Sequence, residues 1–515
     1  MAILGKLLKR GIKLWETIEQ ENSSPYDLQK AELKKILINA RETEFGIHYD
    51  FSNILKSFKS KEANSFYNAY KTQVPIFDYD KIFSEWWHKT RSGSKDVCWP
   101  GKVKYFALSS GTSGDSSKYI PVTKDMMKAI QRTSIRQILT LPRYDIPGKL
   151  YDKGILMLGG STSLRRIESF YDGDLSGITA SKIPFWFQHF YKPGKEISKN
   201  PDWNKKLEEI TLKAKEWDIG VIVGVPAWLQ LLMEKIIAHY QVESIHDIWP
   251  NLSIFVHGGV AFEPYRRGFE KLLTKPLIYI ETYLASEGFI AFQAYPDRNS
   301  MRLVQNNGLF YEFVLFNEEN FDSEGRLKAD AETCMIDQVE EGKEYAILLT
   351  TCAGAYRYII GDVIKFISVK DSELIIIGRT KHFLSLCGEH LSVDNMNQAV
   401  KLVSDELDID IKEFAVAGIP EGSLFAHKWW VGCDCAADAK IIRQKIDEAL
   451  KKLNDDYLTE RNFALKEMYL EKVPTELFYK WMRLQGKEGA QNKFPRVLKK
   501  EKLNQWQDFL KEELG

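Results

Sequence analysis

Strand-like apolar runs alternate with amphipathic stretches through the middle of the chain, and this alternation limits the possible folds more than any other feature. Residues 226–240 and 265–273 are the amphipathic stretches. The apolar runs are GILMLGG (154–160), IGVIVGV (219–225), LSIFVHGG (252–259) and LIYIETY (277–283). Strands buried on both faces have continuous apolar sequences, so the pattern predicts α/β layers around a partly parallel sheet.

The pattern changes twice further along the chain. Residues 309–377 form β-rich runs joined by short turns, typical of an antiparallel meander or a β-barrel-like section. Residues 392–453 have the pattern helix, strand, strand, helix, which indicates a small α+β unit. We therefore expect a large N-terminal domain over residues 1–380 and a small mobile C-terminal domain over residues 381–515, joined by a hinge.

Length and charge limit the classes of function. The 515 residues, 44% of them hydrophobic, are too many for one ordinary core, so two or three domains are expected. Lys plus Arg and Asp plus Glu both number 71, which argues against a nucleic-acid binder held mainly by phosphate contacts. No apolar run reaches the about 20 residues of a membrane span. Residues 1–18 are basic and amphipathic, and we expect a first helix packed on the domain rather than a targeting peptide.

Scattered cysteines suggest no disulfide framework and are typical of a reducing cytosol. They are Cys98, Cys334, Cys352, Cys387, Cys433 and Cys435. One residue separates Cys433 from Cys435, but no second Cys or His pair at zinc-like spacing accompanies them. We therefore expect both to be ordinary strand residues. We also expect a cytoplasmic protein with no membrane partner, and predict no oligomeric state.

A Ser/Gly-rich segment from Ser109 to Lys118, SSGTSGDSSK, follows a strand-like run. Glycine lets backbone N–H groups converge on a phosphate, hydroxyls add donors, and the lysine adds a positive charge. The spacing is not that of the P-loop in kinases and GTPases, and a flexible surface loop is the competing interpretation.

A second motif, YLASEG (283–288), follows the last strand-like run. Tyr283 can stack on a base, Ser286 can donate to a phosphate, and Glu287 can help ligate Mg²⁺. Taken alone, strand-end residues of these types are more often plain surface positions.

Three further motifs lie towards the C-terminus. In YRYIIGDV (356–363), Asp362 can accept both hydroxyls of a ribose, although a Gly-Asp pair is usually only a turn. In GRTKHFLSLCGEH (378–390), Arg379 can hold a ribose or phosphate, and Lys381 lies where two domains would pivot. In GAQNKFPR (489–496), Lys493 presents a cation. A basic linker and a polar tail loop are the simpler interpretations when each motif is taken alone.

Together, in this order, the motifs resemble those of the acyl-adenylate-forming superfamily, which includes acyl-CoA synthetases, peptide-synthetase adenylation domains and luciferases. The chain is similar, almost end to end, to one branch, the auxin-responsive (Gretchen Hagen) acyl acid amido synthetases. The segments that carry this resemblance are SSGTSGDSSKYIP (109–121), TEFGIHYDF (43–51), VPIFDYDKI (74–82), YRYIIGDV (356–363), LNDDYLTERN (453–462) and NKFPR (492–496).

The resemblance implies an ATP- and Mg²⁺-dependent ligase that forms an acyl-adenylate and passes the acyl group to an amine, with an amino acid as the expected acceptor. It implies catalytic roles for Lys118, Glu287 and Lys493, with Glu287 as the Mg²⁺ ligand and Lys381 as the hinge. The implied nucleotide-binding residues are Ser109, Ser110, Gly111, Thr112, Ser113, Gly114, Lys118 (phosphates), Tyr283 (adenine), Ser286 (phosphate), Asp362 and Arg379 (ribose).

The chain departs from its relatives at two places. Acyl-CoA synthetases usually have Pro-Lys-Gly where this chain has Ser117, Lys118 and Tyr119. Plant members of the branch tend to have Asp-Lys where it has Glu389 and His390. A histidine holds phosphate by charge only when protonated, so the acyl and acceptor specificities of the plant members do not transfer to this chain.

Two other functions would use the same motifs. An acyl-CoA ligase shares the adenylation step and differs in its acceptor, whereas a non-catalytic binder of a small acid or nucleotide would release no pyrophosphate. Two interpretations remain for each set of residues that could line the acyl pocket. Arg132 and Arg136 can meet a second carboxylate or remain solvated, and the aromatic run at 184–191 can line a pocket or pack in the core.

Overall fold

The structure is a computed structural model. The residues that it describes are 24–109, 118–183, 187–259, 262–322, 325–380, 384, 391, 393–421, 424–454, 457–458, 461, 465–486, 494–498 and 500–515.

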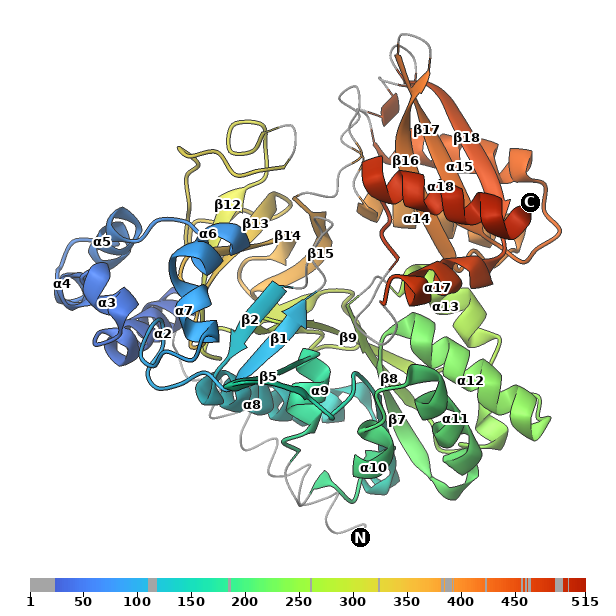
Figure 1. Cartoon of the computed structure of the whole chain (residues 1–515), viewed down its shortest axis with the longest axis horizontal. Helices are drawn as coiled ribbons and strands as arrows, with labels where there is room; N and C mark the ends of the chain where they lie inside the picture. Colours follow the sequence, from blue (N-terminus) through green and yellow to red (C-terminus); the bar gives the residue numbers. More distant parts are fainter. Residues whose placement is uncertain are drawn as a thin grey trace.

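One mixed sheet of eleven strands organises the large N-terminal unit (Figure 1). Its strand order is β12-β13-β14-β15-β11-β10-β9-β8-β7-β3-β6. The parallel part confirms the predicted α/β pattern. It consists of β3 (Gly154–Leu158), β6 (Tyr191–Lys192), β7 (Ile219–Gly224), β8 (Ile254–Gly258) and β9 (Ile278–Ala285).

The predicted antiparallel meander forms the other part of the same sheet. It consists of β10 (Gly288–Phe292), β11 (Met301–Leu303), β12 (Leu309–Leu315), β13 (Glu344–Thr351), β14 (Tyr358–Ser368) and β15 (Glu373–Arg379). Within the described residues no barrel closes, because β15 pairs with β11 and so continues into the parallel strands, which leaves β12 as an end strand of the sheet. The barrel-like expectation is corrected to an open sheet.

A smaller sheet crosses the middle of the unit. Its order is β2 (Lys118–Val122), β1 (Tyr105–Ser109), β5 (Phe170–Gly173) and β4 (Arg165–Ile167). β1 and β2 are antiparallel neighbours, and the segment that joins them is the Ser/Gly-rich motif. The smaller sheet thereby fixes where that motif begins and ends.

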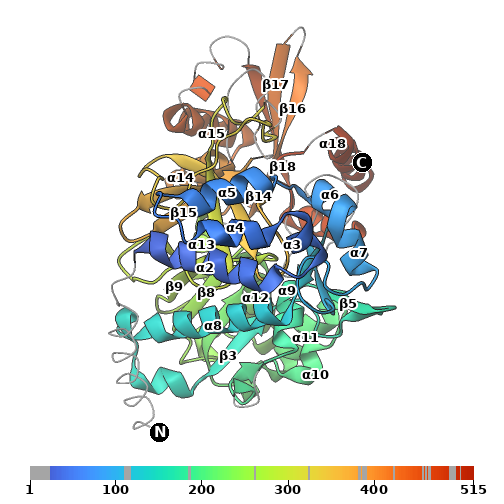
Figure 2. The ribbon, with the colours of Figure 1, turned by 90° about the vertical axis from the view of Figure 1, so that its left-hand side faces the viewer.

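Helices cover both parts of the large sheet. On the N-terminal side, α2, α4 and α5 lie side by side with α8 beneath them (Figure 2). On the parallel side, α11, α12 and α13 pack against one face (Figure 1). The bounds are α2 (Pro25–Ala40), α3 (Glu44–His48), α4 (Phe51–Ser57), α5 (Ser65–Gln73), α6 (Tyr79–Ile82), a π-helix (Phe83–Trp87), α7 (His88–Arg91), α8 (Lys124–Thr140), α9 (Leu175–Ala180), α10 (Lys195–Ser198), α11 (Trp203–Lys213), α12 (Pro226–Tyr240) and α13 (Glu263–Glu270). Short 3₁₀ turns span Leu141–Tyr144, Gly148–Asp152, Ala214–Glu216 and Ile245–Asp247.

The small C-terminal unit is a three-stranded sheet with helices on both faces, as an α+β unit requires. Neighbouring residues of β17 face opposite sides: Trp429 packs under α14 and α15, and Trp430 packs under α17 and α18. The elements are α14 (Val393–Leu407), β16 (Glu413–Glu421), β17 (Leu424–Gly432), α15 (Ala439–Leu453), β18 (Leu465–Val473), α17 (Thr475–Leu484) and α18 (Lys500–Leu514). The expected boundary at residues 380 and 381 falls between β15 and α14, and its role as a hinge stays a prediction.

The two units share an apolar core next to α12 and α13. Trp228 of α12, Phe269 of α13 and Trp481 of α17 belong to one buried cluster. The C-terminal unit accordingly lies against these helices (Figure 1). Among the described residues, no helix is long and apolar enough to cross a membrane.

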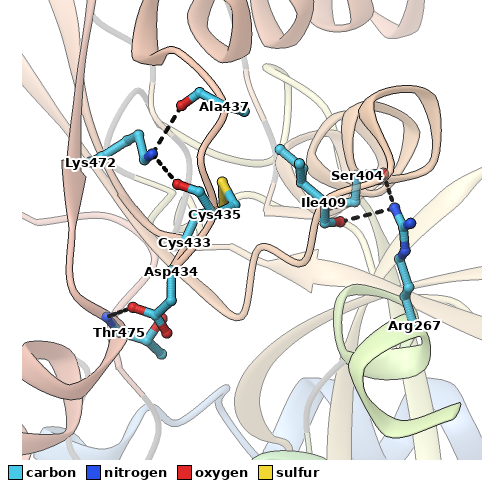
Figure 3. The surroundings of a disulfide bond; sticks show 9 residues. All are labelled: Arg267, Ser404, Ile409, Cys433, Asp434, Cys435, Ala437, Lys472 and Thr475. Atoms are coloured by element: carbon cyan, nitrogen blue, oxygen red, sulfur yellow. Dashed lines mark hydrogen bonds between the residues drawn. A yellow bond between two sulfur atoms is a disulfide. The ribbon is translucent and has the colours of Figure 1, made fainter. Parts of the chain in front are cut away.

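One expectation about cysteines is wrong. Cys433 and Cys435 are joined by a disulfide in the segment after β17 (Figure 3). Cys98, Cys334 and Cys352 are free. An extended strand holds residues i and i+2 about 6.7 Å apart. The chain bends after Gly432, which brings the two Cα atoms to 5.3 Å, within disulfide range.

Candidate active site

Lys118 is the last residue of the Ser/Gly-rich motif. It begins β2 and pairs in register with Ser109, the last residue of β1. Its Nζ lies 5.5 Å from the centroid of the Tyr79 ring. Ser110, Gly111, Thr112, Ser113 and Gly114 lie outside the described residues, so a phosphate-binding role for them stays a prediction. The hairpin does place a lysine where that segment ends.

Glu287 lies in the tight turn between β9 and β10, next to Ser286. Burial raises the pKa of its carboxyl group and its own backbone N–H lowers it. Asp362 raises this pKa further, whereas Lys118 and Arg379 lower it. Charges act on a pKa in this way only from nearby, and Glu287 and Ile120, which is two residues from Lys118, line one small cavity. The fold therefore gathers Glu287, Lys118, Asp362 and Arg379, which are far apart in the sequence.

Tyr283, Asp362 and Arg379 form a hydrogen-bonded network across the sheet. The Tyr283 hydroxyl donates to Asp362 Oδ2 at 2.5 Å, and Arg379 Nε lies 2.9 Å from Asp362 Oδ1. Asp362 and Arg379 are register partners in β14 and β15. Arg379 also donates through Nη2 to the Ile360 carbonyl at 2.7 Å. A carboxylate can accept about four hydrogen bonds, so Asp362 is oriented and keeps acceptor capacity for ribose hydroxyls.

The ring of Tyr283 is buried, with 5% of the residue exposed. Burial raises the pKa of its hydroxyl well above the ordinary value, and Asp362 raises it further. Tyr283 is therefore a neutral hydrogen-bond donor in this structure. Adenine stacking on its ring stays a prediction.

Two titratable residues of the parallel strands, the buried His257 and the half-buried Glu281, were not predicted from the sequence. His257 and Glu281 are register partners in β8 and β9. Burial lowers the pKa of His257 to about 4, with a further lowering by Arg266. Burial raises the pKa of Glu281 to about 7, with a further increase from Glu263. The available signal was a single His or Glu within each of two apolar strand-like runs.

The donor set fits a magnesium ion that arrives with a nucleotide. The described part of the chain contains no group of three or more His, Cys, Asp and Glu residues that would hold a metal ion by itself. In nucleotide sites, Mg²⁺ uses one or two carboxylates together with phosphate oxygens and water. Glu287 supplies one such carboxylate, on which the charge of Lys118 acts, and its role as the Mg²⁺ ligand stays a prediction.

The other predicted positions either lie outside the described residues or make other contacts. Lys381, Glu389, His390 and Lys493 lie outside the described residues. Arg132 lines a cavity of about 620 Å³ between α2 and α8, whose lining includes neither Lys118 nor Glu287. Arg136 Nη1 donates to Asn306 Oδ1 at 2.5 Å. From the aromatic run, Tyr191 is buried and its hydroxyl is 2.7 Å from Ser198 Oγ, which is a core contact.

Arg357, from the same motif as Asp362, has a structural position. Its Nε lies 3.0 and 3.1 Å from the two carboxylate oxygens of Glu312, and both residues are buried. It also donates to the Val74 carbonyl at 2.9 Å and to Thr333 Oγ1 at 2.9 Å. This buried network ties the segment after α5 to β12 and β14.

Comparisons with known proteins identify similar sequences along most of the chain. A model of the GH3 family N-terminal domain matches residues 14–212, the GH3 family central domain matches 302–376, and the GH3 family C-terminal domain matches 394–502. The indole-3-acetic acid-amido synthetase GH3.2 of Arabidopsis thaliana is 22% identical over 474 residues, which are 77% of this chain and 81% of the relative. The jasmonoyl–L-amino acid synthetase GH3.5 of Oryza sativa subsp. japonica is 27% identical over 176 residues, 32% of this chain and 30% of the relative.

Two solved structures share the fold across both units. The GH3.15 acyl acid amido synthetase superposes with a TM-score of 0.75 at 16% identity, covering 98% of this chain and 96% of the other. A 2-hydroxyisobutyryl-CoA ligase in complex with its acyl-AMP superposes with a TM-score of 0.60 at 11% identity, covering 93% and 91%.

Proposed function

The chain belongs to the GH3 family, and from this we propose that it is an ATP-dependent acyl acid amido synthetase. It would activate a carboxylic acid as an acyl-adenylate and transfer the acyl group to an amine, with an amino acid as the expected acceptor. The observation that carries the proposal is the Asp362–Arg379 ion pair, which interacts electrostatically with Glu287, as Lys118 at the start of β2 also does. This set supplies a phosphate cation, a metal-binding carboxylate and a ribose acceptor.

In the first half-reaction, the acid's carboxylate attacks the α-phosphorus of ATP in line and pyrophosphate leaves. The protein's work is to hold two anions together and to stabilise charge that moves onto the pyrophosphate. Lys118 and the segment 109–114 would hold the β- and γ-phosphates. Glu287 would hold Mg²⁺, which neutralises phosphate oxygens when bound.

The rest of the network would hold the nucleoside. Asp362 accepts the ribose hydroxyls while Tyr283 and Arg379 keep its two oxygens in position. Ser286 adds a donor beside Glu287. Orientation by bonded partners matters because a small misplacement of a reacting group costs much of the rate.

In the second half-reaction, the amine nitrogen attacks the carbonyl carbon of the mixed anhydride. The new C–N bond forms, the nitrogen loses a proton to solvent, the C–O bond to the phosphate breaks, and AMP leaves. We propose that residues 381–515 turn about Lys381 between the two steps and that Lys493 approaches the α-phosphate in one position. ATP and amino acids are both abundant in the cytoplasm, where we place the enzyme.

The test is acid-dependent exchange of pyrophosphate into ATP, with a panel of indolic, aromatic and fatty acids. Lys118→Ala and Glu287→Gln should each lower exchange about 10²–10³-fold, because each removes one preorganised charged group. Lys128→Ala, a substitution of a lysine that is 70% exposed, is the matched control and should retain the full rate. Full exchange by both site variants would refute the site.

Acceptor dependence separates the competing functions. With the responsive acid in place, release of AMP driven by an amino acid supports the synthetase. Release driven by coenzyme A alone identifies an acyl-CoA ligase. Binding of ATP without any exchange across the panel identifies a non-catalytic binder.

A further inference from the structure

The disulfide between Cys433 and Cys435 has no part in the proposed reaction. It lies in the segment between β17 and α15, and only Asp434 separates the two cysteines (Figure 3). Cys433 is buried in the core of the C-terminal unit, whereas Cys435 is half-buried. A reagent can therefore approach one sulfur from solvent while the other lies behind it.

The segment is attached to the start of α17. The backbone N–H of Thr475 donates to Asp434 Oδ1 at 3.3 Å, and Pro474, which precedes α17, makes no side-chain cap. Lys472 Nζ donates to the carbonyls of Cys435 and Ala437 at 2.6 and 2.9 Å. Asp434, the residue enclosed by the disulfide, thus supplies the cap of α17.

Contacts with the large unit flank this segment on two sides. On one side, the Tyr479 ring of α17 lies 6.1 Å from the Trp228 ring of α12. On the other, Arg267 of α13 donates to the carbonyls of Ser404 and Ile409 at 2.5 and 3.2 Å (Figure 3). Ile409 packs in the same apolar cluster as Cys433. A change in the backbone bend at Asp434 would therefore displace residues that take part in both contacts.

We propose that Cys433 and Cys435 form a reversible dithiol–disulfide site that controls how firmly the C-terminal unit docks on α12 and α13. The oxidant is a low-molecular-weight disulfide, of which glutathione disulfide is the probe. This inference concerns a second chemistry of the chain and does not depend on the proposed synthetase reaction.

The exchange proceeds in two balanced steps. The Cys435 thiolate attacks one sulfur of glutathione disulfide, forms a mixed disulfide and releases a glutathione thiolate, which takes up a proton. The Cys433 thiolate then attacks the Cys435 sulfur and releases the second glutathione. Two protein thiols are oxidised and one glutathione disulfide is reduced to two thiols. A dithiol reverses the process.

The disulfide holds the backbone bent at Asp434. Its reduction lets the Cα atoms of Cys433 and Cys435 move apart towards the spacing of an extended strand. Asp434 then leaves the N–H of Thr475, and α17 loses its cap. A capping side chain changes the local opening equilibrium of a helix about fivefold, so amide exchange at the start of α17 should be about fivefold faster in the reduced protein.

The experiment uses the full chain, equilibrated with glutathione disulfide or with dithiothreitol, then alkylated and digested for mass spectrometry. We expect the peptide with Cys433 and Cys435 to take up no alkyl group after oxidation and two after reduction. Alkylation is carried out in denaturant so that burial protects no thiol from the alkylating reagent, and Cys98 and Cys352, which are buried while the protein is folded, should take up one alkyl group each in both samples. Reaction of both cysteines despite glutathione disulfide, or a bond that dithiothreitol leaves intact, overturns the proposal.

Hydrogen exchange tests the coupling to docking. Exchange at α17 and at α13 should be faster in the reduced wild type than in the oxidised wild type, and equal rates overturn the coupling. Asp434→Ala keeps both cysteines but removes the cap, so α17 should exchange fast in both redox states. Cys435→Ser should match the reduced wild type under either treatment.

Discussion

Replacing Glu312 by alanine should destabilise the large unit by about 3–5 kcal/mol, the usual cost of removing one partner of a buried ion pair. Glu312 is 1% exposed, and its oxygens lie 3.0 and 3.1 Å from Arg357 Nε. The Tyr67 hydroxyl donates to Glu312 at 3.0 Å as well. The substitution therefore leaves a buried guanidinium without its counter-ion and removes an acceptor from a buried hydroxyl. Hydrogen bonds from Arg357 to Val74 and Thr333 do not neutralise the charge.

Urea unfolding, followed by tryptophan fluorescence, measures this loss as a shift in midpoint at constant slope. Glu340→Ala is the matched control, because Glu340 and Lys343 are 2.7 Å apart but 63% and 47% exposed. Such exposed pairs contribute roughly 0–1 kcal/mol. Replacing Glu312 by leucine together with Arg357 by methionine should recover much of the loss, because no charge is left buried. A Glu312→Ala protein within about 1 kcal/mol of the control would refute the reasoning.

Three further predictions concern residues in and near the site. Tyr283→Phe removes the hydroxyl that donates to Asp362, and we expect about a tenfold higher KM for ATP in pyrophosphate exchange, because a hydrogen bond to a charged acceptor contributes roughly 1.5–3 kcal/mol; an unchanged KM would contradict the ribose role. Glu281→Gln should remove a pH dependence of stability. In urea titrations its free energy of unfolding should rise by roughly 3 kcal/mol relative to that of the wild type as the pH increases from 4.5 to 8. Parallel pH profiles of the two proteins would disprove the raised pKa. Gly361 has a φ of +83°, and no atom would lie closer than 3.7 Å to a new Cβ, so Gly361→Ala should lower the free energy of unfolding by about 1–2 kcal/mol through backbone strain alone. Gly378→Ala is the control, because its new Cβ is also unobstructed and its φ is not positive. Equal losses in the two variants would exclude backbone strain as the cause.

The sign for Glu281 follows from which state holds the proton. Burial and Glu263 raise its pKa from 4.5 to about 7 in the folded protein. Between these pH values the folded chain binds a proton that the unfolded chain has lost, so this contribution to stability is full below pH 4.5 and disappears as the pH rises through 7. His257, with its pKa lowered to about 4, gives the opposite slope at acidic pH, and that slope cancels in the comparison of variant with wild type.

Local patterns in the sequence determined the elements and their order. The apolar runs at 154–160, 219–225, 252–259 and 277–283 became β3, β7, β8 and β9, and the amphipathic stretch 226–240 became α12 with the same bounds. Periodicity succeeds here because it depends on the side chains of one segment and on which face they must bury. The order of the motifs along the chain was also evident from the sequence, because this order does not depend on which residues are close in space.

Tertiary structure alone decided which residues meet. Tyr283 and Asp362 are 79 residues apart and share a hydrogen bond only because β9 and β14 belong to one sheet. Arg357 precedes Asp362 in one motif, yet its partner is Glu312, 45 residues away. Strand register and the packing of distant segments determine such contacts, and both are properties of the whole core. The same holds for the bend that joins Cys433 to Cys435, where the sequence pattern suggested only a strand.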